Sequence, residues 1–423
     1  MEDLSLNFGR FVGMRVQASP LVALVGSFRT PIADGRTALL QQLAVRLLVG
    51  GTQQRDRRSV ADVFERSGAS LSFESGAARV TFSALACTED LPMLADFLAQ
   101  CLVEPHFDPD GVARERATLA AELRRHALDP RARASAVLSR RLFEAGHPHH
   151  EPTLDERIGC LETLTVDDVR ACHAEMLGAH ELKLVALGGI DPAGCAAEFE
   201  RRLRPWRRSV MPAARSTPLA MPDRGGTTWV PDPGARSSSV FIGTRISFEE
   251  ADGVAAWLAN RILGGSYASR LVASLREAQA LTYSVHSELV DPQADVDGLW
   301  RIAVALSPDK LERGIAAARS ELRRFADAGV TIGELERQRR SATGALLVDA
   351  ASLQGMGSFL LRNMERGAAA VHIEAFVDAL ETVSTQRLQR VAATLEPARL
   401  ETVIVGTLGG SRATCEQQPY SHS

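Results

Sequence analysis

The sequence LETLT at positions 161–165 recurs as LETVS at positions 380–384, an offset of 219 residues. Each copy leads into a helical stretch and then into an apolar strand that ends in glycine, LKLVALGG at 182–189 and LETVIVG at 400–406. A third match lies upstream, where GVARER parallels GELERQ at an offset of 222. Three matches in one order and at nearly one offset predict two copies of one domain of about 210 residues.

A proline-rich stretch separates the two copies. Residues 205–235 hold six of the 19 prolines, and proline fixes φ and removes a backbone donor. We therefore predict a first domain at 1–204, an extended linker at 205–235 and a second domain at 236–423. Five arginines stand at the start of the linker, and we interpret them as a solvated helix end, not as an anion patch: Arg201, Arg202, Arg204, Arg207 and Arg208.

Each half begins with strands and continues with long helices. Apolar stretches, which alternate at 80–86 and 300–306, predict strands at 21–28, 80–86 and 182–188 in the first half, and at 239–246, 283–289, 300–306 and 400–406 in the second. Helical periodicity predicts helices near 37–49, 89–103, 109–127, 131–144, 165–177, 254–263, 309–327, 331–349 and 351–366. This order predicts two α+β domains, each a mostly antiparallel sheet with helices packed on one side.

Composition excludes several classes of protein. Of 423 residues, 45% are hydrophobic and 24% charged, which excludes wholesale disorder, and the net charge of -4 argues against a nucleic-acid partner. The six cysteines form no CxxC pair, which is typical of reduced thiols. The acidic start, Met1-Glu2-Asp3, and the lack of a long apolar run predict a cytoplasmic protein with no membrane partner, or a periplasmic one if a leader was removed.

The residues alone single out few candidate sites. His147, His149 and His150 lie close together, but Pro148 and Pro152 make this stretch a turn, so we interpret it as a polar loop and not as a metal site. The sequence has no GxSxG elbow, no Walker loop and no GxGxxG after a strand. No independent catalytic constellation emerges from these patterns.

Longer motifs resemble the M16 peptidase family, which includes pitrilysin, the insulin-degrading enzymes and the mitochondrial processing peptidases. The segment at 39–52, which ends in Gly-Gly-Thr, and SVADVFERSGA at 59–69 look like the family's amino-terminal part. HPHHEPTLDERIGCLETLTVDDV at 147–169 matches the region after the family's metal site. The most specific match is GGSYASRLVASLREAQALTYSV at 264–285. The resemblance covers nearly the whole chain.

The family's zinc motif is degenerate in this sequence. The resemblance implies His-x-x-Glu-His on the first long helix, and counting back from Gly51-Thr52 places those positions at Gln42, Val45 and Arg46. An amide is a poor zinc ligand, valine takes no proton, and arginine repels a dication. The distal glutamate position, Glu122, persists, and we interpret it as a helix residue that could pair with Arg46. We therefore expect no metal and no cofactor in this chain.

The second-half motif is intact. In the family, an Arg and a Tyr seven residues apart donate hydrogen bonds to substrate carbonyls near the scissile bond, and the matching residues are Arg276 and Tyr283. Both side chains suit a developing oxyanion. The alternative is an arginine on a helix surface and a tyrosine packed at a sheet edge.

The resemblance implies the non-zinc subunit of a two-chain M16 peptidase. It predicts a heterodimer with a homologous zinc-bearing subunit, inactive alone, that cleaves peptides in a closed chamber with Arg276 and Tyr283 as this chain's contribution. An alternative is a catalytically silent structural or peptide-binding subunit of a larger complex. An independent enzyme that uses other residues is the third alternative.

Overall fold

The computed structural model describes residues 1–31, 35–206, 225–248, 252–290, 297–365 and 373–407. The first half forms strands β1 (Glu2–Leu6), β2 (Gly9–Arg15), β3 (Leu21–Arg29), β4 (Ser70–Ser75), β5 (Arg79–Cys87) and β6 (Leu182–Gly188). Its helices are α1 (Gly35–Leu47), α2 (Arg57–Ser67), α3 (Leu91–Val103), α4 (Pro109–His126), α5 (Pro130–Leu142), α6 (Leu154–Thr163), α7 (Val166–Met176) and α8 (Pro192–Leu203).

The second half has a similar order of elements, with one strand fewer at its start and no described helix after its last strand. Its strands are β7 (Thr227–Pro231), β8 (Ser238–Ile246), β9 (Val285–Val290), β10 (Gly298–Leu306) and β11 (Glu401–Gly406). Its α-helices are α9 (Gly253–Asn260), α10 (Leu311–Ala328), α11 (Ile332–Asp349), α12 (Leu353–Glu365), α13 (Ile373–Thr382) and α14 (Thr385–Ala393). Two π-helical segments, η3 (Arg261–Gly265) and η4 (Val272–Ala278), stand between α9 and β9.

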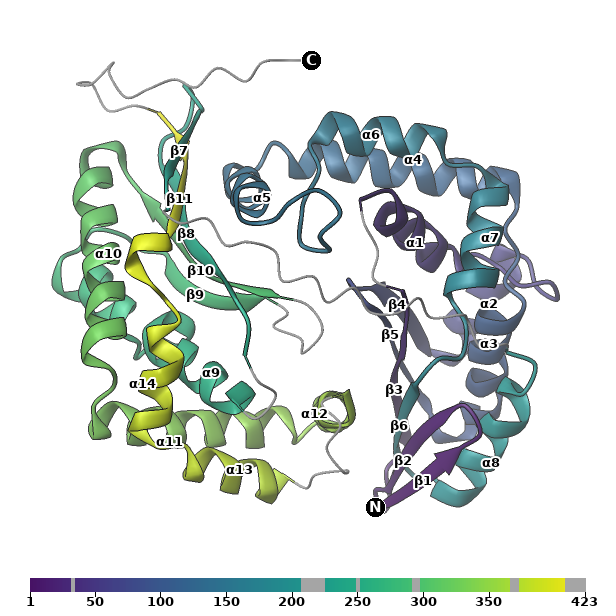
Figure 1. Ribbon diagram of the computed structural model, residues 1–423. Helices are drawn as coiled ribbons and strands as arrows, with labels where there is room; N and C mark the ends of the chain where they lie inside the picture. Colours follow the sequence, from purple (N-terminus) through teal and green to yellow (C-terminus); the bar gives the residue numbers. More distant parts are fainter. Residues whose placement is uncertain (32–34, 207–224, 249–251, 291–296, 366–372, 408–423) are drawn as a thin grey trace. The chain divides into compact units, whose positions relative to one another are not determined.

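Apart from β1, which only the first sheet has, the two sheets share one topology. The first runs β1-β2-β6-β3-β5-β4 and the second β7-β11-β8-β10-β9 (Figure 1). In the first sheet, β6 pairs antiparallel with β3 and parallel with β2. In the second sheet, β11 likewise pairs antiparallel with β8 and parallel with β7. Two α+β halves with matching, mostly antiparallel sheets confirm the predicted fold class.

The predicted strands and helices are present with small shifts of their ends, but the sequence reasoning left several elements out. Strands β1 and β2 were not predicted. Strand β7 lies inside the stretch 205–235 and is an edge strand of the second sheet, which is a position that tolerates Pro231. Residues 207–224 of that stretch lie outside the described residues.

One face of the first sheet packs on α1, α3 and α8 and forms the larger core. Leu24 on β3 and Leu184 on β6 are fully buried in it, together with Phe97 and Leu98 of α3. Phe28 meets Trp206 edge to face, with ring centroids 4.9 Å apart. Alternate strand residues point to the opposite face, so β3 and β6 carry a second apolar surface.

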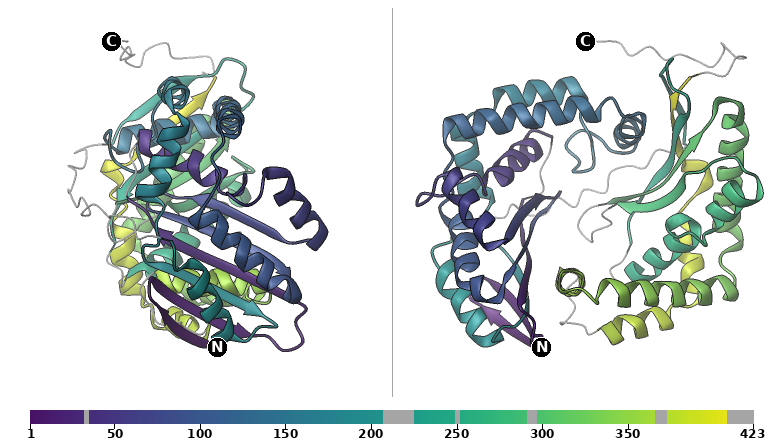
Figure 2. Two further views of the ribbon diagram at one scale, coloured as in Figure 1. Left: turned by 90° about the vertical axis from the view of Figure 1, so that its right-hand side faces the viewer. Right: turned by 180° about the vertical axis from the view of Figure 1, so that it is seen from behind.

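That second surface is covered by α12, a helix from the other half of the sequence (Figures 1 and 2). Val25 and Leu187 of the sheet pack with Phe359, Leu360 and Met364 of the helix. At Gly357 the approach is close enough that an added Cβ would lie 2.9 Å from both Leu187 and Val25 side chains. The helices of this sheet therefore occupy both faces, where the sequence predicted one.

Helix α5, from the first half of the sequence, packs on β8 and β11 of the second sheet. Leu138 of α5 is fully buried, and its side chain lies 3.2 Å from where a Cβ on Gly243 of β8 would stand. Arg133 pairs with Asp232 at 3.0 Å, and Arg141 lies 3.6 Å from the buried Glu401 of β11. The compact units consequently interleave in sequence, one holding α12 and the other α5.

No single described helix is both long and apolar enough to span a membrane. The pair α11 and α12 satisfies length and composition together, with a bend of 119° between them.

The packing of α12 predicts a large difference between two leucine substitutions. Leu360 is 2% exposed and Leu347, on α11, is 54% exposed. Leu360→Ala leaves a cavity against β3 and β6 and should lower the free energy of unfolding by about 2–5 kcal/mol. Leu347→Ala, the matched control, should change it by less than about 0.5 kcal/mol. Urea unfolding followed by circular dichroism measures both, and equal effects would contradict the assignment of α12 to this core.

Candidate functional site

Helix α1 carries the three degenerate motif positions. Val45 is buried and contributes only packing, and Gln42 is half-buried. The Arg46 guanidinium donates to Glu115 at 2.9 Å and to Glu122 at 2.5 Å, both on α4. The interpretation of Glu122 as a helix residue paired with Arg46 is confirmed.

The ion triad shifts the pKa values of Arg46 and Glu122. The hydrogen bond to Glu122 raises the pKa of Arg46 above its usual value, against the opposing effect of burial. The same hydrogen bond lowers the pKa of Glu122. Arg46 thus brings a permanent positive charge to two carboxylates and ties α1 to α4.

Zinc does not fit these residues. A tetrahedral site needs three or four deprotonated nitrogen, sulfur or oxygen ligands, and the motif positions supply an amide, a methyl-bearing side chain and a cation. Across the part of the chain that the structure describes, no group of three or more His, Cys, Asp and Glu side chains could hold a metal ion.

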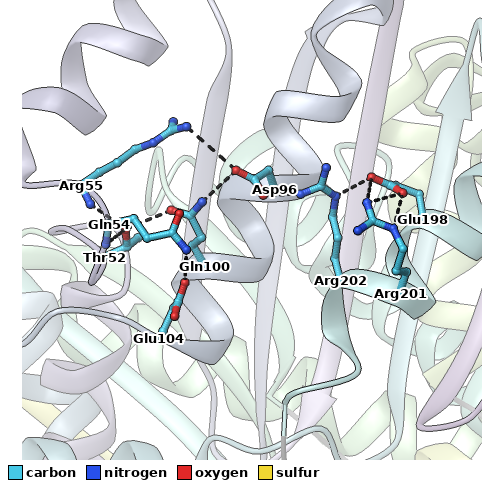
Figure 3. A network of polar contacts seen from close by, with 9 residues as sticks. All are labelled: Thr52, Gln54, Arg55, Asp96, Gln100, Glu104, Glu198, Arg201 and Arg202. Atoms are coloured by element: carbon cyan, nitrogen blue, oxygen red, sulfur yellow. Dashed lines mark hydrogen bonds and ion pairs between the residues drawn. The ribbon is translucent and has the colours of Figure 1, made fainter.

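The loop after α1 is anchored by a polar network that the sequence reasoning missed (Figure 3). The buried Thr52 donates to Gln100 of α3 at 3.0 Å, and Gln100 donates to Asp96 at 2.8 Å. Asp96 also pairs with Arg202 of α8. The signal available in the sequence was only the Gly-Gly-Thr turn, because the partners lie about 50 and 150 residues away in sequence.

The histidine loop packs instead of gathering around a common point. His147 stacks on Phe143 with ring centroids 4.3 Å apart, and His150 Nδ1 lies 2.8 Å from the Phe143 carbonyl oxygen. Arg157 pairs with Glu151 at 2.8 Å. These contacts give the loop a structural role.

Arg276 and Tyr283 stand at the two ends of a tight connection. Arg276 belongs to η4, and Tyr283 lies two residues before β9. Leu281 N donates to the carbonyl of Leu275 at 2.8 Å, and the buried Thr282 hydroxyl donates to the Ala305 carbonyl of β10 at 2.5 Å. The first bond closes the connection on η4, and the second fixes the backbone beside Tyr283 to the sheet.

Both side chains point into solvent. Tyr283 is 93% exposed, and Arg276 is exposed as well. Among the described residues no carboxylate pairs with Arg276; its guanidinium carbon lies 5.6 Å from the ring centroid of Tyr267. The alternative of a tyrosine packed at the sheet edge does not fit such an exposed ring. Two exposed hydrogen-bond donors on a rigid frame can bind carbonyl oxygens or an oxyanion.

Arg270, six residues before Arg276, has the opposite environment. It donates to both carboxylate oxygens of Glu334 at 2.6 and 2.8 Å and to the Gly329 carbonyl at 2.6 Å. Burial raises the pKa of Glu334, but the bonds from Arg270 and Thr331 outweigh that effect and lower the pKa to about 2. Arg270 is therefore structural, whereas the donors of Arg276 are turned to solvent.

Sequence models of two peptidase domains match the chain. The one described as Insulinase (Peptidase family M16) matches residues 33–151, and the one described as Peptidase M16 inactive domain matches residues 163–342. A protein of Mycobacterium bovis described as an uncharacterized zinc protease is 23% identical over 384 residues, 88% of this chain and 84% of that protein. A likewise described protein of Bacillus subtilis is 22% identical over 340 residues, 79% of this chain and 78% of that protein.

Solved structures share the fold over the whole chain. A structure described as a peptidase M16 inactive domain from Pseudomonas fluorescens covers 99% of both chains with a TM-score of 0.84 and 20% identity. A protease from Helicobacter pylori covers 96% of this chain and 99% of that one, with a TM-score of 0.81 and 15% identity. Fold and domain matches define a duplicated α+β protein of the peptidase class. The chain belongs to the M16 peptidase family.

The degenerate motif predicts that this chain binds no stoichiometric zinc. After mild chelation and dialysis against zinc, elemental analysis of the purified chain should give far less than one zinc per chain, because Gln42, Val45 and Arg46 offer no ligand set. The chain alone should also cleave no peptide. About one zinc per chain, retained through gel filtration, would contradict this reading.

The ion triad predicts a pH-dependent contribution to stability. Because the folded-state pKa of Glu122 is lowered, the stabilisation is present above its ordinary value of 4.5 and is lost as pH falls further through the folded pKa. Arg46→Gln should lower the free energy of unfolding by about 0.5–1 kcal/mol at pH 7, since the side chains are about one-third exposed.

The control is Arg201→Gln, which removes a more exposed pair with Glu198 and should have a smaller effect. Urea unfolding at pH 7 and at pH 3 measures the difference between wild type and each variant. If Arg46→Gln lowers the free energy of unfolding as much at pH 3 as at pH 7, the ion triad does not explain the effect.

Proposed function

We propose that this chain is the complementary, non-zinc subunit of a heterodimeric M16 peptidase. In this proposal a homologous partner subunit holds the zinc and the general base, and this chain closes the peptide-binding chamber. Arg276 and Tyr283 donate hydrogen bonds to the substrate carbonyls at the partner's metal site. The reaction is endoproteolysis of peptides, and this chain alone is inactive.

One contrast supports the proposal. On α1, Arg46 is engaged by the two carboxylates of an internal ion triad, whereas Tyr283 and Arg276 are exposed on a short connection with no carboxylate partner among the described residues. An exposed tyrosine and an unneutralised arginine contribute little to folding, so their chemistry is available to a ligand.

The donors suit a proteolytic transition state. As water adds to a peptide carbonyl, its oxygen gains negative charge, and the phenol hydroxyl and guanidinium bond that oxygen more strongly than the ground-state carbonyl. In the proposed complex the partner's zinc supplies the metal-activated water. This chain's residues supply orientation and charge stabilisation.

A sheet edge lies beside these donors. Strand β9, which follows Tyr283, is an edge strand of the second sheet and pairs on its inner side with β10. Strand addition through backbone hydrogen bonds would tolerate many peptide sequences. We include this mode of binding in the proposal.

The rival function is a structural or peptide-binding subunit without a catalytic role. It predicts that Arg276 and Tyr283 do not affect turnover. A neighbouring reading frame that encodes a similar chain with intact His-x-x-Glu-His would favour the peptidase heterodimer and would supply the partner for reconstitution.

The proposal predicts that Tyr283→Phe lowers kcat of the reconstituted heterodimer. Removal of one oxyanion donor costs on the order of 10²–10³-fold in rate. The chain should fold and pair normally, because the lost hydroxyl is on a 93% exposed side chain. Arg276→Ala should lower kcat as well and also raise KM, since a cation binds the ground-state peptide too. Steady-state cleavage of a fluorogenic peptide measures both constants.

Gel filtration controls for assembly of each variant complex. Wild-type kcat and KM in both variants, with the complex intact, would refute a catalytic role and favour the scaffold.

A further inference from the structure

Tyr267 is an exposed aromatic residue on a firmly held turn. Its side chain is 82% exposed. The neighbouring Ser266 hydroxyl donates to the Arg261 carbonyl at 3.1 Å, and the buried Gln338 of α11 donates to Ser266 Oγ at 2.7 Å and to the Ala268 carbonyl at 3.4 Å. The turn is thus fixed on both sides of a ring that buries little surface of its own.

The π-helical segments η3 and η4 lie on either side of this turn. Such segments are rare and occur often at functional sites, because the extra residue per turn redirects side chains at a cost in helix stability. Here η4 carries Arg276, and its guanidinium carbon lies 5.6 Å from the Tyr267 ring centroid. That distance is within the range of a cation–π interaction.

Whether a carboxylate or an aromatic ring contacts Arg276 determines how many of its N–H donors can bind a ligand. Arg270 and Arg301 of the second half also lie over phenylalanine rings, but each of them pairs with a carboxylate as well, Arg270 with Glu334 and Arg301 with Glu288. A carboxylate neutralises the guanidinium and occupies its N–H donors. An aromatic ring contacts the guanidinium carbon from one side, so it limits the motion of the long side chain while the in-plane N–H groups remain available.

We propose that Tyr267 is a positioning residue for Arg276: its ring orients the guanidinium and leaves its donors free for a substrate carbonyl. This inference rests on the proposed function of Arg276 and adds a residue to it. Tyr267 touches no reacting atom in this arrangement. Its effect on the reaction passes through Arg276 alone.

A double-mutant cycle in the reconstituted heterodimer tests the coupling. Tyr267→Leu removes the ring and should lower kcat/KM by about 2–5-fold, the fold-change that corresponds to an exposed cation–π interaction. Tyr267→Phe keeps the ring and should restore wild-type kcat/KM. In the Arg276→Ala background, Tyr267→Leu should have no further effect.

The outcomes separate this inference from the proposed function. If Arg276→Ala leaves kcat/KM unchanged, the proposed function fails. If Arg276→Ala lowers it but Tyr267→Leu does not, or if Tyr267→Leu acts equally in both backgrounds, the positioning role fails. A loss in Tyr267→Phe as large as that in Tyr267→Leu would assign the effect to the hydroxyl and overturn the proposal.

A second measurement uses this chain alone. The side-chain Nε–Hε resonance of Arg276 should carry a ring-current shift that survives in Tyr267→Phe and disappears in Tyr267→Leu. The matching resonance of Arg301, which lies 5.1 Å over the Phe241 ring, is the internal control and should not move. An Arg276 resonance that Tyr267→Leu leaves unchanged would overturn the contact on which the proposal depends.

Discussion

Each sheet of this protein has two apolar faces, and the second face is covered by a helix from the other half of the sequence. Helix α12 packs on β3 and β6, and α5 packs on β8 and β11. Hydrophobic burial on both faces requires this exchange, because leaving either face bare would expose a contiguous apolar surface to water. Neither half therefore completes its core from its own chain segment.

The two exchanged helices are held by different interactions. Helix α12 contributes Phe359, Leu360 and Met364 to an apolar cluster, and one polar bond joins Ser27 to Glu365 at 2.6 Å. Helix α5 combines buried apolar residues such as Leu138 with ion pairs from Arg133 and Arg141. The repeat thus preserves the geometry of the exchange while the chemistry of its contacts has diverged.

The two halves also differ in how their candidate site residues are partnered. On α1 the Arg46 guanidinium donates to the carboxylates of Glu115 and Glu122. Its positive charge would repel a divalent cation at this position. In the second half, Arg270 forms an ion pair with Glu334, while the side chains of Arg276 and Tyr283 are exposed to solvent. The proposed role as a non-zinc subunit rests on this contrast between the two halves.

From the sequence, repeated segments gave evidence of the duplication and apolar patterns gave evidence of the two α+β halves. The resemblance to M16 peptidases located Gln42, Val45 and Arg46, and their residue types are unsuited to zinc. The tertiary structure was needed to show which helix covers which sheet face. The amphipathic patterns of α5 and α12 predict that each helix buries one face, but not which strands that face packs against. The tertiary structure also added Glu115 to the expected pair of Arg46 and Glu122, and it placed Tyr267 beside Arg276. Such contacts depend on side-chain positions fixed by long-range packing, which local sequence patterns do not encode.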